Sequence, residues 1–559
     1  MRLFGYGVVS GLAKVSPVDP AVRRLVTNRF RFRRLGVLPA IIGVALATVG
    51  FNVETLRCAA EPPRASVSPL PGGTLDSQTQ SETTASSAGW AAEALAEAVQ
   101  HDERLRARLG LDFAAYRTSL DELPIGVFDS GVGGLTVLEQ LLTIDQHDNA
   151  TGRPGPDGIA DFQNESFIYL GDQANMPYGN YAAAGREDYL RQLILNDAIF
   201  LLGRRYWPAV NAANPVDDKP PVKAIVIACN TATAYGLDDL RAAIQRWDLP
   251  VPVIGVVEAG SESVVRMLSR DTSAAGAIGV LATVGTCSSE AYPRAIARAA
   301  GQRGRRLPTV WQQGSLGLAG AIEGAPTFLV PPTALSEKYE GPAVANGAAP
   351  IDPALAAVYD FDPDGLIGDP DQPQSWRLNS IENYVRYDVV TMVENYRRSG
   401  ATQAIEAVVL GCTHFPYESE RIHAALLRLR EYRDADGKQP YRELIAPEVQ
   451  LVDPGVLTAQ QLFRQLFLER RLSRTRQEAK PELHGAFISV PAPQVAADLL
   501  TEEGGFRSDY KYGREPQIDS TPDVRVVPLQ PTALPASAQN LLRQHAPITW
   551  ESLTQTVTQ

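Results

Sequence analysis

Two cysteines stand in similar surroundings, each at the end of an apolar segment. The stretch VIACNTATA contains Cys229, and the stretch VVLGCTHFPY contains Cys412. In both, a β-branched run is followed by a small residue, then by the cysteine, and then by residues with helical spacing. A thiol between a strand end and a helix N-terminus lies in the positive end of the helix dipole, which lowers its pKa. We therefore expect an accessible thiolate at both positions.

Polar neighbours of these cysteines offer hydrogen bonds and a further titratable group. Asn230, Thr231 and Thr413 follow the two thiols and can cap a helix or donate to a bound anion. His414 stands two residues after Cys412 and titrates near neutral pH. A single cysteine on a buried strand is usually a small core residue. Two cysteines in matching contexts instead favour a functional pair.

A glycine-rich turn follows another apolar run. The stretch IGVFDSGVGGLTVL places Asp129 and Ser130 at a predicted strand end, before amides that could hold a carboxylate. Thr136 stands where the third glycine of a dinucleotide fingerprint would be, and no lysine follows as in a P-loop. The turn therefore does not indicate a nucleotide site.

Short apolar runs alternate with helical spacing from Leu123 onward. The runs are IGVFD (125–129), SFIYLGD (166–172), KAIVIACN (223–230), VPVIGVVE (251–258), AIGVLAT (277–283) and AVVLGCT (407–413). Strands that alternate with helices predict an α/β fold with mainly parallel sheets. Ligands bind at the carboxyl ends of such strands, and YLGDQANMPYGN adds the acid Asp172 and the aromatic donor Tyr178 to that rim.

Composition limits the class of protein. The chain has 559 residues, a net charge of -12 and no basic stripe, so a nucleic-acid surface is not indicated. At ~100 to 200 residues per domain, the length suggests several domains. The four cysteines form no CxxC pair, which argues against a disulfide framework or a zinc site and suits a reducing compartment. Cys58 and Cys287 lack the surroundings of the pair and are assigned no chemistry.

The N-terminal residues 1–60 differ from the rest. Four arginines precede an apolar run at 35–51, the order of a signal peptide or signal anchor. The run is at the short limit for a membrane span of ~20 residues. Membrane contact through this run is one expectation, and an amphiphilic leader or a misassigned start is the alternative. Residues 61–122 are expected to form a disordered linker and then a helical segment.

Three clusters of Pro, Asp, Asn and Gly predict surface insertions, at 145–164, 211–221 and 360–374. The third contains a D-x-D-G string similar to part of a calcium loop. No distal glutamate follows at the required spacing, so we expect a solvated turn there and no metal site.

Together these stretches resemble the glutamate racemase family, within the cofactor-independent aspartate/glutamate racemase superfamily. The matching stretches lie between about residues 123 and 465, in the family's order, and are IGVFDSGVGGLTVL, YLGDQANMPYG, VIACNTATA, VPVIGVVEAG, IGVLATVGTCSSEAY, VWQQGSLGLAGAIE and VVLGCTHFPY. The resemblance implies interconversion of L- and D-glutamate without a cofactor, which supplies D-glutamate for peptidoglycan. One thiolate would remove the α-proton and a second thiol would return a proton to the opposite face.

The resemblance also implies roles for individual residues. The implied catalytic residues are Cys229, Cys412, Asp129, His414, Asp172 and Glu323. Asp129 and His414 would polarise the thiols, with His414 on the Cys412 side. The stretch around Glu323 departs from the family pattern, with Ser315 where a Cys-Pro usually begins and Gly320 in place of a proline. The implied substrate contacts are Asp129, Ser130, Pro177, Tyr178, Gly179, Asn230, Thr231, Thr283, Thr286, Thr413 and His414.

The family fold has two similar three-layer α/β domains, related by a pseudo-two-fold axis and facing across a cleft, with one cysteine from each. We expect the first domain at 123–254 plus 445–470 and the second, with insertions, at 255–444. Residues 471–559 form a C-terminal extension without an assigned role.

Alternatives remain within and outside this family. An aspartate or hydantoin racemase is the nearest, and GCTHFP together with DSGVGG argues for glutamate. A non-catalytic, membrane-attached module on the same fold is motivated by the leader and opposed by the complete Cys, His and Asp set. A thiol hydrolase would leave the second cysteine unexplained. Two obligatory free thiols favour a cytoplasmic active site, and a homodimer is one option for the assembly.

Overall fold

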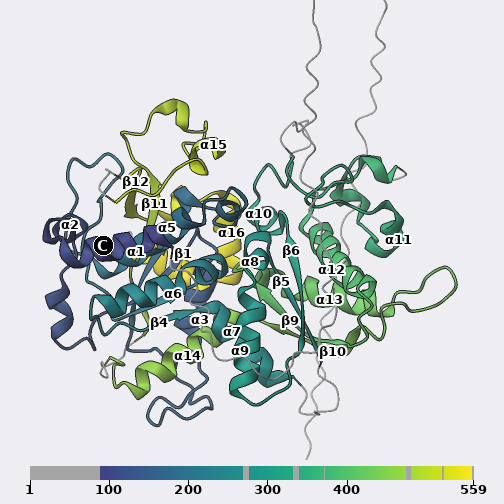
Figure 1. Cartoon of the computed structure of the whole chain (residues 1–559), viewed down its shortest axis with the longest axis horizontal. Helices are drawn as coiled ribbons and strands as arrows, with labels where there is room; N and C mark the ends of the chain where they lie inside the picture. Colours follow the sequence, from purple (N-terminus) through teal and green to yellow (C-terminus); the bar gives the residue numbers. More distant parts are fainter. Residues whose placement is uncertain are drawn as a thin grey trace, which may run out of the picture. The chain divides into compact units, whose positions relative to one another are not determined.

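The computed structural model describes residues 89–268, 276–330, 339–369, 372–473, 480–518 and 522–556 (Figure 1). The chain divides into two compact units, residues 1–82 and 83–559, and every described residue belongs to the second. The expected leader, with its apolar run at 35–51, and most of the expected linker lie outside the described residues. No helix within the described ranges is long and apolar enough to cross a membrane.

A six-stranded sheet carries the first part of the candidate site. Its strand order is β12–β11–β2–β1–β3–β4. The strands are β1 (Ile125–Asp129), β2 (Ser166–Gly171), β3 (Ala224–Ile227), β4 (Val253–Gly255), β11 (Glu482–Pro491) and β12 (Val524–Pro528). All neighbours are parallel except β11 and β12. Phe128 pairs with Leu170 and Ile227, so the residues that follow β1, β2 and β3 emerge at one edge.

A four-stranded parallel sheet carries the second part, in the order β10–β9–β5–β6. The strands are β5 (Ala277–Thr283), β6 (Thr309–Ser315), β9 (Ile405–Gly411) and β10 (Ile445–Val452). Ala282 pairs with Gly411, which brings the ends of β5 and β9 to the same edge. The predicted α/β fold with mainly parallel sheets is confirmed.

Helices cover both faces of each sheet. Those on one face of the six-stranded sheet are α1 (Trp90–His101), α2 (Glu103–Leu109), α5 (Glu187–Leu202) and α6 (Asn230–Arg246). Those on its other face are α3 (Leu135–Thr143), α14 (Pro454–Leu468), α16 (Ala536–His545) and α17 (Pro547–Thr556). Phe128 packs in the first layer and its neighbour Val127 in the second, as the alternation of a strand requires. We refer to this sheet and its helices as the first lobe.

The second lobe comprises the four-stranded sheet and its helices. One face packs against α10 (Leu318–Glu323), α12 (Ile381–Arg398) and α13 (Ser419–Glu431). The other packs against α7 (Val256–Met267) and α9 (Ala291–Gln302). The short helices of the two lobes are α4 (Gly179–Ala183), α8 (Val284–Ser288), α11 (Ala356–Tyr359) and α15 (Ser508–Lys511).

The chain returns to the first lobe at a different point from the one expected. The sequence predicts 445–470 in the first domain, but β10 pairs with β9 and buries Ile445 and Val449 in the second lobe. The return begins at α14, where Asp453 caps the helix and Pro454 takes the first helical position. The apolar face of α14 then packs on the six-stranded sheet.

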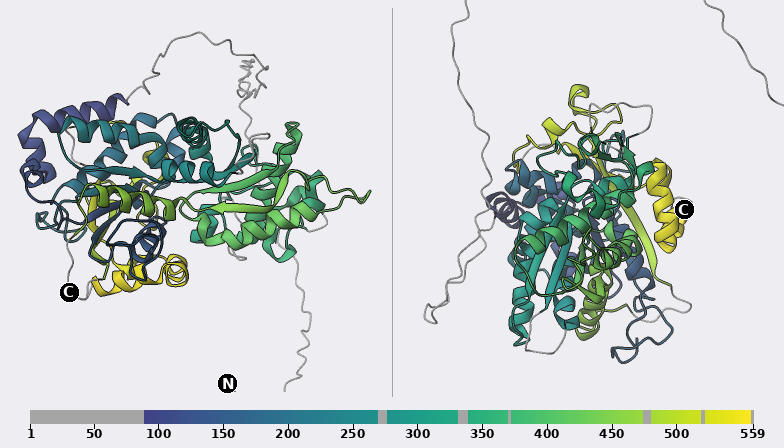
Figure 2. Two further views of the ribbon diagram at one scale, coloured as in Figure 1. Left: turned by 90° about the horizontal axis from the view of Figure 1, so that it is seen from below. Right: turned by 90° about the vertical axis from the view of Figure 1, so that its right-hand side faces the viewer.

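The C-terminal extension is part of the first lobe. Strand β11 pairs in parallel with β2, and β12 pairs with β11. Helices α16 and α17, drawn in yellow, lie together on one face of this sheet (Figure 2). Local patterning of residues 471–559 did not reveal this, because the partner strand of β11 lies more than 300 positions earlier in the chain, as the separation of 317 between Ser489 and Asp172 illustrates.

The insertions are built from turns whose side chains bond to their own backbone. At 145–164, one carboxylate oxygen of Asp161 accepts from the amides of Gln146 and His147, both at 3.0 Å. At 360–374, Asp362 accepts from the amide of Asp364, and the two-residue strand β7 (Leu366–Ile367) pairs with β8 (Arg377–Leu378). Across the described parts of the chain, no group of three or more His, Cys, Asp or Glu side chains could hold a metal ion.

Candidate active site

The glycine-rich turn folds around the carboxylate of Asp129. One oxygen of Asp129 accepts from the amides of Gly131 at 3.2 Å and Gly134 at 2.9 Å. A Cβ on Gly134 would stand 2.5 Å from the Cβ of Asp129, so the turn requires glycine there. Burial raises the pKa of Asp129, although the charge on His414 and the two amides lower it. These two amides therefore serve the protein's own carboxylate, whereas we expected them to hold one from a ligand.

Cys229 lies beside this turn, at the start of α6. Its sulfur accepts from the amide of Ala232 at 3.4 Å and contacts the hydroxyl of Ser130 at 3.6 Å. Burial, followed by the Asp129 carboxylate, nevertheless raises the pKa of Cys229 to about 12. The expected lowering of this pKa is contradicted, because desolvation outweighs the helix N-terminus. Cys229 is therefore a protonated thiol at neutral pH and suited to donate a proton.

Three residues of the second lobe form a chain of contacts around the other cysteine. Cys412 follows β9, and its sulfur lies 3.7 Å from Nδ1 of His414. Nε2 of His414 lies 2.8 Å from the carboxylate of Glu323, the last residue of α10. Burial would lower the pKa of His414, but Glu323 and Cys412 together raise it well above 6.5. The imidazole can thus hold a proton between an acid and a sulfur.

The two lobes meet between these groups. A Cβ on Gly133, in the turn of the first lobe, would stand 2.5 Å from Cε1 of His414 and 2.6 Å from the hydroxyl of Thr413. The hydroxyl of Thr136 donates to the carbonyl of Thr413 at 3.2 Å. The charge of His414 lowers the pKa of Asp129, and the Asp129 carboxylate in turn raises the pKa of Cys229. The glycine-rich turn therefore contacts both Cys229 and His414, the neighbour of Cys412.

Threonine and asparagine side chains form a second contact between the lobes. The hydroxyl of Thr231 lies 3.1 Å from that of Thr286 and 3.4 Å from that of Thr283. Tyr292 of α9 donates to the side-chain carbonyl of Asn230 at 2.5 Å. Four residues expected to bind substrate are therefore gathered at the ends of β3 and β5, where their donors lie close together.

The segment after β2 is used differently from the expectation. Asp172 accepts from Tyr178 at 2.5 Å, Ser489 at 2.6 Å and Asn175 at 2.9 Å. The Tyr178 hydroxyl also lies 2.7 Å from Asp197, so it is not a free donor at the rim. Asp172 and Tyr178 therefore stabilise the loop that follows β2.

The backbone of that loop reaches the second lobe. Pro177 follows a cis peptide bond, and Gly179 opens α4. A Cβ on Gly285 would stand 2.6 Å from the Cα of Gly179. Gly179 thus lies near the threonine contact through its main chain.

Comparison with known proteins finds sequence similarity to racemases. The sequence model of the Asp/Glu/hydantoin racemase family matches residues 203–327. The glutamate racemase of Pediococcus pentosaceus is 29% identical over 344 residues, which cover 61% of this chain and 81% of that protein. The chain is a homologue of the glutamate racemases. The glutamate racemase of Limosilactobacillus fermentum is 39% identical over 181 residues, but this match covers 32% of the chain and 50% of that racemase.

Solved glutamate racemases also align with the chain. The Francisella tularensis enzyme in complex with D-glutamate aligns at 21% identity and a TM-score of 0.36, over 65% of this chain and 88% of that one. The Thermus thermophilus enzyme in complex with beta-chloro-D-alanine aligns at 24% identity and a TM-score of 0.35, over 66% and 87% of the two chains.

Several supporting residues of this racemase homologue were not found from the sequence. Tyr169 donates to the carbonyl of Gly131 at 2.6 Å and holds the glycine-rich turn. It lies within YLGDQ, so a tyrosine on a buried strand was the available signal. Asp197, Ser489 and Tyr292 have no such signal, because each joins the site through a distant contact.

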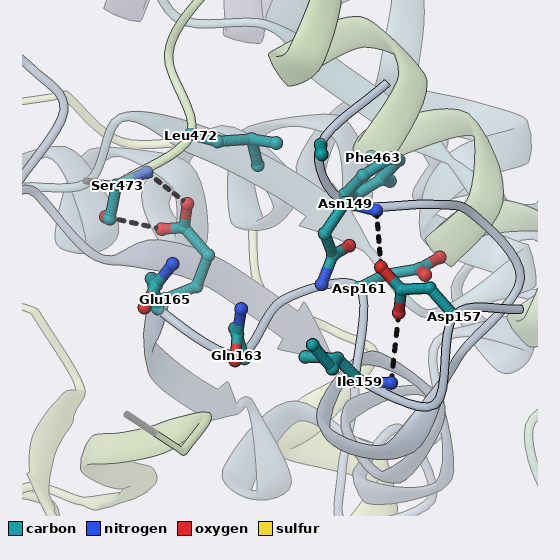
Figure 3. Close-up of a pocket in the computed structure, with 11 residues that line it drawn as sticks. Asn149, Asp157, Ile159, Asp161, Gln163, Glu165, Phe463, Leu472 and Ser473 are labelled. Atoms are coloured by element: carbon teal, nitrogen blue, oxygen red, sulfur yellow. Dashed lines mark hydrogen bonds between the residues drawn. The ribbon is translucent and has the colours of Figure 1, made fainter. Parts of the chain in front are cut away.

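A surface pocket of about 450 Å³ lies apart from the candidate site of the racemase homologue, between the insertion at 145–164 and α14 (Figure 3). Its acids are already bonded. Asp157 accepts from the amides of Asn149 at 2.8 Å and Ile159 at 3.0 Å. Glu165 accepts from Ser473 and pairs with Lys223 at 2.7 Å. These carboxylates hold the insertion and the C-terminal extension in place.

Proposed function

We propose that this protein is a glutamate racemase, which interconverts L- and D-glutamate by moving the α-proton between Cys229 and Cys412. One relationship supports the proposal most directly. The turn that contains Asp129 and Gly133 lies beside Cys229 and against His414, the partner of Cys412. Two acid/base sulfurs from opposite lobes are the arrangement that inversion at one carbon requires. The homology to glutamate racemases supports the same activity.

The chemistry needs one deprotonated sulfur and one thiol. The deprotonated sulfur takes the α-proton, an S–H bond forms, and the electron pair of the broken C–H bond stays on Cα and its carboxylate. The thiol on the opposite face then gives its proton to Cα and becomes deprotonated. Because its pKa is raised to about 12, Cys229 suits the donor role at rest. His414 can exchange a proton with Cys412 through Nδ1.

Substrate binding is proposed for the donors at the strand ends. The proposed side chains and main-chain groups are those of Ser130, Pro177, Gly179, Asn230, Thr231, Thr283, Thr286 and Thr413. Hydroxyl and amide donors suit the two carboxylates of glutamate, and fixed donors also stabilise charge that develops on the α-carboxylate. Asp172 and Tyr178 are proposed to act indirectly, by holding the loop that contains Pro177.

The proposed cellular role is supply of D-glutamate for peptidoglycan, from an active site in the reducing cytoplasm. The three cysteines of the described residues, Cys229, Cys287 and Cys412, are free, and free thiols persist in a reducing compartment. Membrane contact through 35–51 and assembly as a homodimer stay hypotheses. Cell fractionation tests the first, and the mass of the purified protein in solution tests the second.

The activity itself is tested with purified full-length protein and no added cofactor. L-glutamate, D-glutamate and L-aspartate are incubated separately, and the enantiomers are resolved by chiral chromatography. We expect each glutamate enantiomer to approach an equal mixture and L-aspartate to stay unchanged. Conversion of L-aspartate alone would replace glutamate with aspartate as the substrate. Conversion of none of the three would end the racemase proposal.

A further inference from the structure

Helix α16 of the C-terminal extension contacts both lobes. Leu542 is buried in the core of the first lobe, whereas its neighbour Leu541 packs on the core of the second. His545 stacks edge-on against Tyr417 of the second lobe, with ring centroids 5.0 Å apart. The N-terminal end of α16 lies against the end of α10 through Ser537. The helix therefore contacts both lobes beside the end of α10.

Ser537 binds the residue that orients His414. Its hydroxyl donates to the main-chain carbonyl of Glu323 at 2.5 Å. A helix leaves its last carbonyls without partners inside the helix, and the two amides that follow Glu323 bond to Ala321 and Gly320 instead. Gly324 has a φ of 75°, and a Cβ there would stand 2.9 Å from the Cβ of Ser537. Ser537 thus fixes the turn that ends α10.

A fixed end of α10 matters because of what its last side chain does. The Glu323 carboxylate lies 2.8 Å from Nε2 of His414, and the opposite ring nitrogen faces Cys412. Among the described residues, Asp129 of the first lobe also interacts electrostatically with this ring. Movement of the Glu323 backbone would lengthen the carboxylate–imidazole contact and leave the other two groups in place.

We infer that Ser537 is a positioning residue for the Glu323–His414–Cys412 chain, and that α16 is a structural part of the second half of the active site. The contact between Ser537 and Glu323 stands on geometry alone, whereas its kinetic consequence rests on the proposed racemase function. Nothing in the resemblance gave residues 471–559 a role. The local contacts of α16 show why the extension belongs to the site.

The test compares Ser537→Ala with Ser508→Ala in the full-length protein. Ser508 is exposed at the start of α15, in the same extension, and serves as the matched control. Glu323→Gln removes the carboxylate charge itself and gives the largest shift expected for the pKa of His414. The first readout is the pKa of His414 from NMR titration of labelled histidine. The second is the pH dependence of kcat for L-glutamate.

In Ser537→Ala we expect the pKa of His414 to fall by about one unit, because a nearby carboxylate favours the imidazolium. The alkaline limb of kcat should move down by the same amount, with a loss of about tenfold in kcat and little change in KM. Ser508→Ala should match the wild type in both readouts. An unshifted His414 titration in Ser537→Ala overturns the inference, whether or not activity falls. A shifted titration in a protein that does not racemise glutamate upholds the positioning role and rejects the proposed function.

Discussion

Gly133 of the turn after β1 lies directly against His414 at the end of β9, so that an added Cβ would stand 2.5 Å from the ring carbon Cε1. The two residues belong to different lobes. Their contact brings the turn that holds Asp129 to the imidazole that serves Cys412. Because there is no room for a Cβ beside the ring, this approach requires glycine at position 133.

Gly133→Ala is therefore expected to impair catalysis, because the methyl group must push the turn and the imidazole apart. A misplacement of about 1 Å at an active site costs about 100-fold, so we expect a loss of that order in kcat/KM. Gly301→Ala, in α9, is the control, since an added Cβ there meets nothing within 4 Å. Steady-state kinetics of both variants give the answer. Wild-type activity in Gly133→Ala would show that the lobes need not touch at this point.

Asp129→Asn should lower the pKa of Cys229. Burial is the largest cause of the raised pKa and the Asp129 carboxylate the next, so removal of that charge favours the thiolate. The rate of alkylation of Cys229 by iodoacetamide at pH 8, followed by peptide mass spectrometry, should rise. Asp238→Asn changes an exposed carboxylate on α6 and should leave the rate unaltered. Equal rates in the wild type and Asp129→Asn would remove Asp129 from the control of this thiol.

Asp197 is expected to hold a proton in the folded protein. The Tyr178 hydroxyl has one hydrogen but lies against both Asp172 and Asp197, so one carboxyl must donate to it. Burial, then the charge of Asp172, raises the pKa of Asp197 well above 3.8. A raised folded pKa means that the folded state keeps this proton while the unfolded state loses it. Stability therefore falls as pH rises above the ordinary value of 3.8 toward the raised one.

Asp197→Asn removes that titration and keeps an N–H donor for Tyr178. Its free energy of unfolding should decline less than that of the wild type between pH 5 and pH 8, where one group contributes at most about 1.4 kcal/mol per pH unit. Urea unfolding at both values provides the comparison, with Asp238→Asn as the exposed control. Parallel pH profiles for Asp197→Asn and the wild type would place the proton elsewhere.

Removal of one partner from the buried ion pair between Lys223 and Glu165 should strongly destabilise the protein. The charged atoms lie 2.7 Å apart, and the side chains are 0% and 1% exposed. Lys223→Met leaves Glu165 buried without its cation and should cost about 3 to 5 kcal/mol in urea unfolding. Lys438→Met breaks a pair whose side chains are both 75% exposed and should have little effect. A small loss in Lys223→Met would mean that Glu165 takes up a proton at little cost.

The sequence predicted the strands that end at or just before Asp129, Cys229 and Cys412, because each is an apolar run followed by polar residues. It could not predict that β11 joins β2 or that Ser489 binds Asp172, since pairing between distant segments leaves no local pattern. The homology to glutamate racemases is likewise confirmed.

The pKa of Cys229 also depends on contacts with distant segments, which the local sequence does not reveal. The helix N-terminus that follows the cysteine can be read from its neighbours, and the amide of Ala232 does contact the sulfur. Other segments of the chain bury the thiol and place the Asp129 carboxylate near it. Both effects raise the pKa of Cys229, whereas the sequence predicts that it is lowered. Tyr178 was likewise expected at the rim, but its partner Asp197 lies on α5.

Exchange of the α-hydrogen in deuterated water tests the two-thiol mechanism most directly. L- and D-glutamate are incubated with the wild type, Cys229→Ala, Cys412→Ala and the control Cys287→Ala, and deuterium at Cα is followed by NMR. We predict that the wild type and Cys287→Ala label both enantiomers while they racemise, and that neither Cys229→Ala nor Cys412→Ala racemises at a measurable rate. Racemisation at the wild-type rate in either of these two variants would contradict proton transfer between Cys229 and Cys412.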